Sequence, residues 1–312
     1  PSRRLSRHHA WVQAMTGCTN FCSYCVVPSA RGPEQSRRPR DVVEEVRRLV
    51  DDGVVEVTLL GQNVNAYGLE TDPGAGSGRH VDFAGLLEMI DAIDGLKRIR
   101  FTTSHPKDLG RSLIEAMRDL PAVCEHLHLP VQSGSNHILG RMKRGYTRES
   151  YQELVEGLRC QIPSIALTTD IIVGFPGERE EDFSRTMTLV ERSGFDGAFT
   201  FVYSPRPATE AASLPGRVPE TTLKRRMKEL VALVQEVALR KNMALKGGTV
   251  EVLTEGPSRH GGGQCRGRTR GNKIVNFKVP DGMRAPNAGH LAAVNIESAT
   301  STTLKGIMQL PA

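Results

Sequence analysis

Residues 17–25 read GCTNFCSYC and carry three cysteines, Cys18, Cys22 and Cys25, at the spacing C-x3-C-x2-C. Three thiolates in one short loop can bind three corners of a 4Fe-4S cluster, whose irons prefer thiolate ligands, and they leave the fourth iron open. A structural zinc site is the main alternative, but it requires four ligands, usually as two separated pairs. The segment therefore predicts an iron-sulfur site directly after an apolar stretch of the chain.

Six apolar, β-rich segments recur through the first three quarters of the sequence. They cover residues 10–15, 54–60, 99–103, 127–131, 165–173 and 198–203. Helical periodicity follows most of them, as in Val42, Val46 and Leu49 after the first. Strand-helix units in series predict an α/β fold, with a parallel sheet and helices outside it. Periodicity alone does not distinguish a partial barrel from an open, doubly wound sheet.

The last part of the chain has a different pattern. A long amphipathic segment after Pro219 predicts a helix that closes the α/β core. From Thr249 on, short β segments alternate with glycine-rich turn signals, which is typical of a small β-barrel. We therefore expect two domains, a core with its closing helix over residues 1–246 and a β-barrel over residues 247–312.

Composition limits the class of protein. The 312 residues include 41 Lys and Arg against 35 Asp and Glu, a net charge of +6 that suits contact with a phosphate-rich polyanion. No apolar run approaches the roughly 20 residues of a membrane-spanning helix. Six cysteines are too few for a disulfide scaffold, so we expect a reducing compartment, the cytoplasm, and no membrane partner.

Further motifs accompany the cysteines along the whole α/β core. They lie at residues 25–28, 31–32, 60–67, 103–106, 129–135, 169–178 and 203–207. Together with the cysteine spacing they resemble the radical S-adenosylmethionine (SAM) methylthiotransferases of the MiaB type. Residues 255–258, 267–268 and 275–277 resemble the TRAM module, the RNA-holding β-barrel of these enzymes.

The resemblance implies a fold, two cofactors and a reaction. The fold is a partial (βα)6 barrel followed by a TRAM-like β-barrel. The cofactors are a 4Fe-4S cluster and SAM, which together supply a 5′-deoxyadenosyl radical. The reaction adds a methylthio group to carbon 2 of an isopentenyl-modified adenosine beside the tRNA anticodon. The implied partners are the tRNA anticodon arm and an electron donor such as a flavodoxin-type reductase, and we expect a monomer.

One part of the family pattern does not match. These enzymes carry an N-terminal domain in which three further cysteines bind an auxiliary 4Fe-4S cluster that delivers sulfur. Nothing before Cys18 supplies such a set, and Cys124, Cys160 and Cys265 are scattered singly. We therefore expect the second cluster only in an N-terminal domain that is absent here. This chain would then supply radical generation and tRNA binding, and its start at Pro1 fits a fragment or a processed protein.

Polar residues at predicted strand ends are candidates for binding SAM or substrate, because ligands of α/β barrels bind where the strands end. The candidates are Gln62, Asn63, Asn65, Asp170, Gly174 and Glu178. Asx-type turns are the alternative role for the amides, and a plain strand-to-helix turn is the alternative for the glycine. An aspartate in an apolar strand serves equally well to anchor a loop amide.

Three histidines are candidate acid-base groups, namely His105, His126 and His128. Packed or hydrogen-bonded residues of the barrel are the favoured interpretation, because radical abstraction requires no general base. The sequence therefore leaves the catalytic residues unassigned.

The β-barrel segment carries a basic cluster with one aromatic residue. Its candidates for RNA binding are Arg266, Arg268, Arg270, Lys273 and Phe277. Cations of this kind neutralise phosphates, and an aromatic ring can stack on an unpaired base. Solvated surface charge is the ordinary alternative.

Two other functions stay open. A RimO-type methylthiotransferase acts on a protein, but residues 62–67 and the basic β-barrel favour the tRNA-modifying branch. The second alternative is an RNA-binding module in which the cysteines hold a structural metal.

Overall fold

The computed structural model describes residues 6–69, 81–258 and 263–309. Its core contains six parallel strands in two groups, ordered β1-β4-β5 and β6-β7-β8 and joined by a parallel bridge between Ile99 and Val123. The strands are β1 (His9–Gln13), β4 (Glu56–Leu60), β5 (Arg98–Phe101), β6 (His126–His128), β7 (Ala166–Val173) and β8 (Gly197–Val202). The predicted α/β fold with a parallel sheet is confirmed, and β1 and β8 lie at the two ends of the strand order.

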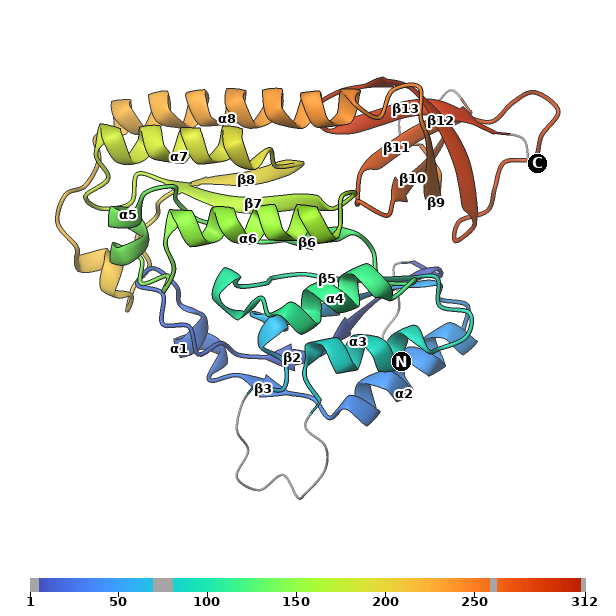
Figure 1. Ribbon diagram of the computed structural model, residues 1–312, viewed down its shortest axis with the longest axis horizontal. Helices are drawn as coiled ribbons and strands as arrows, with labels where there is room; N and C mark the ends of the chain where they lie inside the picture. Colours follow the sequence, from blue (N-terminus) through green and yellow to red (C-terminus); the bar gives the residue numbers. More distant parts are fainter. Residues whose placement is uncertain (1–5, 70–80, 259–262, 310–312) are drawn as a thin grey trace.

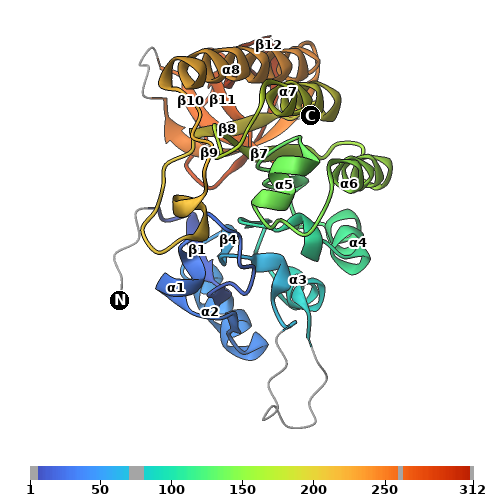
Figure 2. The same cartoon turned by 90° about the vertical axis from the view of Figure 1, so that its left-hand side faces the viewer.

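Helices cover the outer side of this sheet (Figure 2). They are α2 (Pro39–Asp51), α3 (Phe83–Asp91), α4 (Arg111–Asp119), α6 (Arg148–Gln161), α7 (Glu180–Ser193) and α8 (Glu220–Met243). The strand-end loops contain the short elements β2 (Met15–Thr16), α1 (Val27–Arg31), β3 (Gln35–Ser36), η1 (Val64–Ala66), η2 (Pro106–Asp108), α5 (Asn136–Arg141) and η3 (Glu210–Ser213). Glycine ends α7 because Gly194 takes the left-handed conformation, with φ at 53°.

Side chains alternate between the two faces of the strands. On β1, Ala10 and Val12 are buried, whereas Trp11 is exposed. Val57 and Ile99 are buried in the same core as Val12, into which α2 contributes Val46. Successive side chains of a strand point to opposite faces. The alternate side chains, most of which are polar, therefore lie on the other face of the sheet, which we call its inner face.

The C-terminal part is a closed β-barrel with the strand order β10-β11-β13-β12-β9. Its strands are β9 (Thr249–Pro257), β10 (Cys265–Thr269), β11 (Ile274–Lys278), β12 (Leu291–Ala299) and β13 (Thr303–Met308). Val252, Val275 and Ile296 are fully buried in its centre. The predicted β-barrel is confirmed. The sequence indicates β segments at residues 250–253, 274–279 and 291–296, which overlap β9, β11 and β12, and it indicates none at β10 or β13.

Two arginines of β5 join the β-barrel to the core. Arg98 donates a 2.7 Å hydrogen bond to the carbonyl of Arg268, and Arg100 donates bonds of 2.7 Å to the carbonyls of Thr269 and Arg270. Arg98 is the first residue of β5, and Arg100 follows on the same face of the strand. The β-barrel therefore packs on the amino-terminal edge of the parallel sheet, at the right in Figure 1, whereas α1 and α5 lie at the opposite end.

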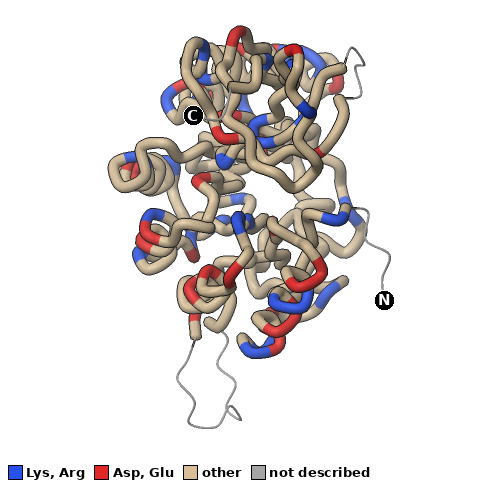
Figure 3. Tube along the Cα trace, turned by 90° about the vertical axis from the view of Figure 1, so that its right-hand side faces the viewer, with Lys and Arg blue, Asp and Glu red and all other residues tan. Residues whose placement is uncertain are grey.

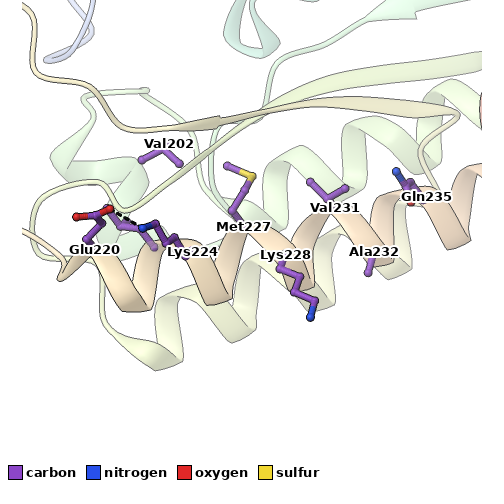
Figure 4. A pocket seen from close by; sticks show the side chains of 9 residues that line it. Val202, Glu220, Lys224, Met227, Lys228, Val231, Ala232 and Gln235 are labelled. Atoms are coloured by element: carbon purple, nitrogen blue, oxygen red, sulfur yellow. Dashed lines mark ion pairs between the residues drawn. The ribbon is translucent and has the colours of Figure 1, made fainter.

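Helix α8 lies beside β8 and leaves a groove of about 730 Å³ between them. Figure 4 shows Met227 and Val231 pointing toward this groove, with Glu220 and Lys224 paired near one end. None of the residues predicted to bind cofactor, metal or RNA lines it. In the ranges given above, no helix is long and apolar enough to cross a membrane.

Candidate radical SAM site

The cysteine loop begins at a glycine that no other residue can replace without a shift. Gly17 has φ at 75°, and a Cβ atom there would lie 1.8 Å from the carbonyl oxygen of Pro33. The amide of Cys18 then donates to the carbonyl of Gly32 over 3.1 Å. This close approach folds the loop back on the residues after α1 at the carboxyl end of β1.

Each of the three cysteine sulfurs accepts a hydrogen bond. The amide of Asn20 donates to Cys18 Sγ, the amide of Val27 donates to Cys25 Sγ, and Arg144 Nη1 donates to Cys22 Sγ, each over 3.4 Å. Such bonds to thiolate sulfur are found around iron-sulfur clusters and influence their potentials. The donor set therefore fits a cluster held by three thiolates.

Burial raises the pKa of both the Cys18 and Cys25 thiols above its usual value. Metal binding requires the thiolate form and releases these protons. Among the described residues, no three His, Cys, Asp or Glu side chains form a group that could hold a single metal ion. A cubane cluster does not require such convergence, because each of its irons takes its own thiolate.

Arg144 is a site residue that the sequence analysis missed. Its guanidinium is buried, donates 2.9 Å bonds to Tyr146 and to the carbonyl of Pro130, and lies 5.3 Å from the centre of the Tyr146 ring. It reaches Cys22 across 122 residues of sequence. No local pattern indicates this contact, so only the folded chain reveals it.

Two of the predicted cofactor-binding residues lie beside the cysteine loop. Gln62 accepts a 2.8 Å bond from the amide of Gly17. Asn63 is buried, and its Nδ2 donates to Asp108 over 2.8 Å and to Glu34 over 3.1 Å. The structure therefore places both amides next to the predicted cluster site, where they hold loops together.

Asn65 is used differently from the prediction. Its Nδ2 donates to the carbonyl of His105, and its Oδ1 accepts from the amide of the same residue, over 2.9 and 2.8 Å. The side chain is buried. It therefore ties the loop after β4 to the loop after β5, and the structure corrects its assignment as a ligand-binding residue.

Gly174 and Glu178 form a turn rather than an open ligand site. The Glu178 carboxylate accepts from the amide of Gly174 over 2.8 Å and from Arg226 Nη1 over 2.7 Å, and its side chain is only 1% exposed. A Cβ atom at Gly174 would lie 2.0 Å from the side chain of Leu223. The assignment of Glu178 as a cofactor-binding residue is corrected, because its carboxylate is buried and paired.

Asp170 lies on β7 and remains partly accessible. Its carboxylate lies 3.4 Å from His128 Nε2, and its side chain is 26% exposed. The other ring nitrogen of His128 lies 3.0 Å from the hydroxyl of Thr168. His105 and His126 are both buried, and burial lowers their pKa values to about 2 and about 3. These two histidines therefore fit the predicted role of packed, neutral residues.

Several buried polar atoms in the loops at the carboxyl ends of the strands have no partner within the described residues. They are Asn63 Oδ1, Ser104 Oγ, His105 Nε2 and Tyr203 Oη. Buried polar groups in proteins are usually hydrogen-bonded, so unpartnered ones at one edge of a sheet fit a polar ligand. A small pocket of about 170 Å³ lies at the same edge, with Tyr24, Phe201 and Tyr203 in its lining.

The four basic residues predicted to bind RNA form two groups. Arg266 and Arg268 share Glu255 as an ion-pair partner. Arg270 pairs with Glu125 over 2.7 Å and Lys273 pairs with Asp196 over 2.7 Å, so both join the β-barrel to the core. Figure 3 shows basic and acidic residues interspersed on this end of the molecule.

Phe277 is fully buried in the centre of the β-barrel. The prediction that its ring is available to stack on RNA bases is therefore wrong. The alternation along β11 turns this side chain inward, together with Val275.

Comparison with known proteins agrees with this geometry. Residues 12–190 match the radical SAM superfamily, and this segment is more than half of the 312 residues. The chain therefore belongs to the radical SAM superfamily, and within it to the family of the tRNA-2-methylthio-N(6)-dimethylallyladenosine synthases. The resemblance inferred from the motifs is confirmed at both levels.

Two relatives define this narrower family. The synthase of Moorella thermoacetica is 52% identical over 99% of this chain and 67% of its own length. The synthase of Thermoanaerobacter sp. strain X514 is 49% identical over 98% of this chain and 63% of its own length. The chain thus spans about two thirds of the length of these relatives.

Solved structures show the same fold at low sequence identity. A radical S-adenosylmethionine methyltransferase, TsrM, from Kitasatospora setae has a TM-score of 0.54 at 21% identity, over 67% of this chain and 41% of that chain. Coproporphyrinogen III oxidase from Escherichia coli has a TM-score of 0.51 at 12% identity, over 89% of this chain and 68% of that chain.

Proposed function

We propose that Cys18, Cys22 and Cys25 bind a 4Fe-4S cluster and that SAM binds beside it at the carboxyl edge of the sheet. The observation that carries this proposal is the hydrogen bond to each of the three sulfurs within one loop. When bound, the cluster and SAM supply a radical that abstracts hydrogen from an unactivated carbon. The protein supplies orientation and excludes water.

The residues around the cysteines have distinct parts in this proposal. Gln62 holds the start of the loop through the amide of Gly17. Asn63 Oδ1 and Tyr203 Oη are buried without a partner, which suits hydrogen bonding to SAM. Asp170 is accessible on β7 and is the carboxylate placed to contact SAM or substrate.

The proposed substrate rests on the family to which the chain belongs. We propose that the chain carries the radical-generating and RNA-binding part of a tRNA methylthiotransferase, which acts on carbon 2 of N6-dimethylallyladenosine. Because the curated relatives are longer, this activity is assigned to the chain as a contribution to the whole reaction. An electron donor of the flavodoxin type, a monomeric state and a cytoplasmic location belong to the same proposal.

We propose that the β-barrel is a TRAM-like module that binds the anticodon arm of tRNA. Support comes from its closed five-stranded architecture and from the cations on β10. Arg266 and Arg268 are partly exposed, with side-chain exposures of 26% and 33%. Contacts with phosphate through such residues weaken as the salt concentration rises.

Anaerobic reconstitution with iron and sulfide tests the cluster. We expect a brown protein that cleaves SAM to 5′-deoxyadenosine and methionine when it is reduced. The variants Cys18→Ser, Cys22→Ser and Cys25→Ser should each lose the colour and the cleavage. Cys160→Ser is the matched control, because that thiol is exposed on α6 and should be dispensable. A colourless zinc protein that still binds tRNA would instead support the structural-metal alternative.

A further inference from the structure

A pocket of about 820 Å³ lies where the inner face of the parallel sheet meets the β-barrel. Trp11 and Thr58 line it from β1 and β4, and Arg268 and Asn272 line it from the β-barrel side. It is separate from the small pocket beside Tyr203, with which it shares no lining residue. Neither the cysteines nor the residues predicted to bind the cofactor line this pocket.

Trp11 is an unusual wall residue for such a pocket. It is the sole tryptophan of the sequence, and 61% of it is exposed although its strand neighbours Ala10 and Val12 are buried. The ring of His9 meets it edge-on, with 4.9 Å between ring centres. Large aromatic side chains gain free energy from burial, so an indole left open on a pocket wall fits a planar ligand.

Polar groups also line this pocket. Arg268 donates to Glu255 over 2.8 Å and to Asn272 Oδ1 over 3.1 Å. Burial lowers the pKa of His9, so near neutral pH its ring carries no charge and Nε2 lies 2.9 Å from the hydroxyl of Thr58. The pocket therefore combines the Trp11 indole with three guanidiniums, two carboxylates and several neutral hydrogen-bonding groups; the charged members are Arg7, Arg100, Arg268, Glu56 and Glu255. An aromatic face beside cations and hydrogen-bonding groups is the combination that proteins use to hold an unpaired nucleobase.

The position of the pocket adds a second argument. The β-barrel packs on the amino-terminal edge of the sheet through Arg98 and Arg100, whereas the cysteine loop follows the carboxyl end of β1. A strand of five residues separates these edges by roughly 17 Å. An RNA that touches both the β-barrel and the cysteine loop must cross this distance, and Trp11, at the middle of β1, lies between them.

We propose that an unpaired nucleobase of RNA stacks on Trp11 in this pocket, with Arg268 and Asn272 beside its edge or its phosphate. The proposal rests on the proposed function, because it takes the RNA substrate from there. The nucleotide concerned is a neighbour of the reactive adenosine rather than the adenosine itself, since Trp11 lies at the middle of β1 and the cysteine loop follows the end of that strand. The pocket would thereby hold the RNA at a fixed register relative to the cluster.

Because Trp11 is the sole tryptophan, its fluorescence reports on this pocket alone. The probe is a synthetic anticodon stem-loop RNA with a terminal dye, so that anisotropy measures binding independently of the tryptophan signal. We expect saturable quenching of Trp11 emission that follows the anisotropy curve, both with and without the reconstituted cluster. Replacing each unpaired nucleotide in turn by an abasic one should identify one position whose loss removes the quenching.

Variants provide the second arm. Trp11→Ala should raise the Kd for the stem-loop roughly tenfold. Trp11→Phe should recover most of the affinity, because a phenyl ring also offers an aromatic face on which a base can stack. Leu239→Ala is the control, since it removes an exposed apolar side chain from α8 and should leave Kd unchanged. Adenosine monophosphate and SAM, each added alone, distinguish an RNA base from a free nucleotide or the cofactor and should not quench Trp11.

Three results would overturn the proposal. Unchanged Trp11 emission together with an unchanged Kd for Trp11→Ala, while the wild-type chain binds the stem-loop, removes this pocket and leaves the proposed function intact. Equal quenching by adenosine monophosphate assigns the pocket to free nucleotides instead. Absence of any stem-loop binding by the wild-type chain at low salt overturns both this inference and the RNA part of the proposed function.

Discussion

The guanidinium of Arg226 donates a 2.7 Å hydrogen bond to the carboxylate of Glu178, and the two side chains are only 4% and 1% exposed. This pair joins α8 to the turn that follows β7, 48 residues earlier in the chain. The same carboxylate caps the amide of Gly174. A buried ion pair thus fixes the backbone at the end of a central strand, at the edge where we place SAM.

Removing one member of this pair should destabilise the protein strongly. Arg226→Met leaves the Glu178 carboxylate buried without its partner, which costs about 3 kcal/mol or more of unfolding free energy. Burial already raises the pKa of Glu178, so in the variant protonation should relieve the unpaired charge. The loss measured by urea unfolding should therefore be larger at pH 8 than at pH 5. Arg225→Ala, an exposed neighbour on α8, is the control, and an equal loss in both variants would contradict the prediction.

Arg98 should be needed to keep the β-barrel packed on the core. It is fully buried and donates to the carbonyl of Arg268 and to Glu251, over 2.7 and 2.8 Å. Arg98→Leu removes both of these bonds from a charged donor, a loss of about 3 kcal/mol. Limited proteolysis should then cut residues 244–248, between α8 and β9, faster than in the wild type. Arg111→Ala, in an exposed pair on α4, should not change the rate.

Arg144 should tune the cluster that we propose. Its hydrogen bond to Cys22 Sγ and its positive charge both favour the reduced, more negative cluster. Arg144→Met should therefore shift the reduction potential to a more negative value, as followed by a redox titration with electron paramagnetic resonance. Lys143→Ala removes a neighbouring exposed cation that pairs with Glu210, and it should leave the potential nearly unchanged. A potential that does not move in Arg144→Met would contradict this role.

His126 should make the protein less stable in acid. Burial, followed by the nearby charge of Arg100, lowers its pKa from 6.5 to about 3. Between these values the unfolded chain binds a proton that the folded protein does not, so this contribution is complete above pH 6.5 and is lost as the pH falls toward 3. The unfolding free energy of wild type should fall by about 1.4 kcal/mol per pH unit more steeply than that of His126→Gln. If the unfolding free energies of the wild type and of His126→Gln change equally between pH 6 and pH 5, this prediction is wrong.

Much of the α/β core was predictable because the residues that become buried are apolar and recur at regular spacings in the sequence. Val42 and Val46 recur at helical spacing because α2 packs one face on the sheet. The strand residues Val12, Val57 and Ile99 are buried in the same core. Strands β10 and β13 were harder to find. β10 reads CRGRT, and its inward positions are Cys265, Gly267 and Thr269, which are too small and too mixed in polarity to form an apolar pattern.

The cysteine loop of the candidate site was the most predictable part, because its residues are neighbours in sequence. Cys18, Cys22 and Cys25 share one loop, so their spacing indicates their chemistry directly. Asn65 and Glu178 follow strand ends as ligand residues do, yet His105 and Arg226 use their polar atoms instead. Phe277 is aromatic within a basic segment, but the barrel closes around it.

The sequence by itself determined the class of this protein: a parallel α/β core, a C-terminal β-barrel and three cysteines spaced for a cluster, because helix period, strand alternation and loop spacing are local properties. Only the tertiary structure decided which polar side chains remain available. Arg144 donates to Cys22, Arg226 pairs with Glu178, and Trp11 lines the same pocket as Arg268. These relationships depend on contacts between distant segments, and the free energy of burying or pairing a charge is set by the partner that folding brings to it.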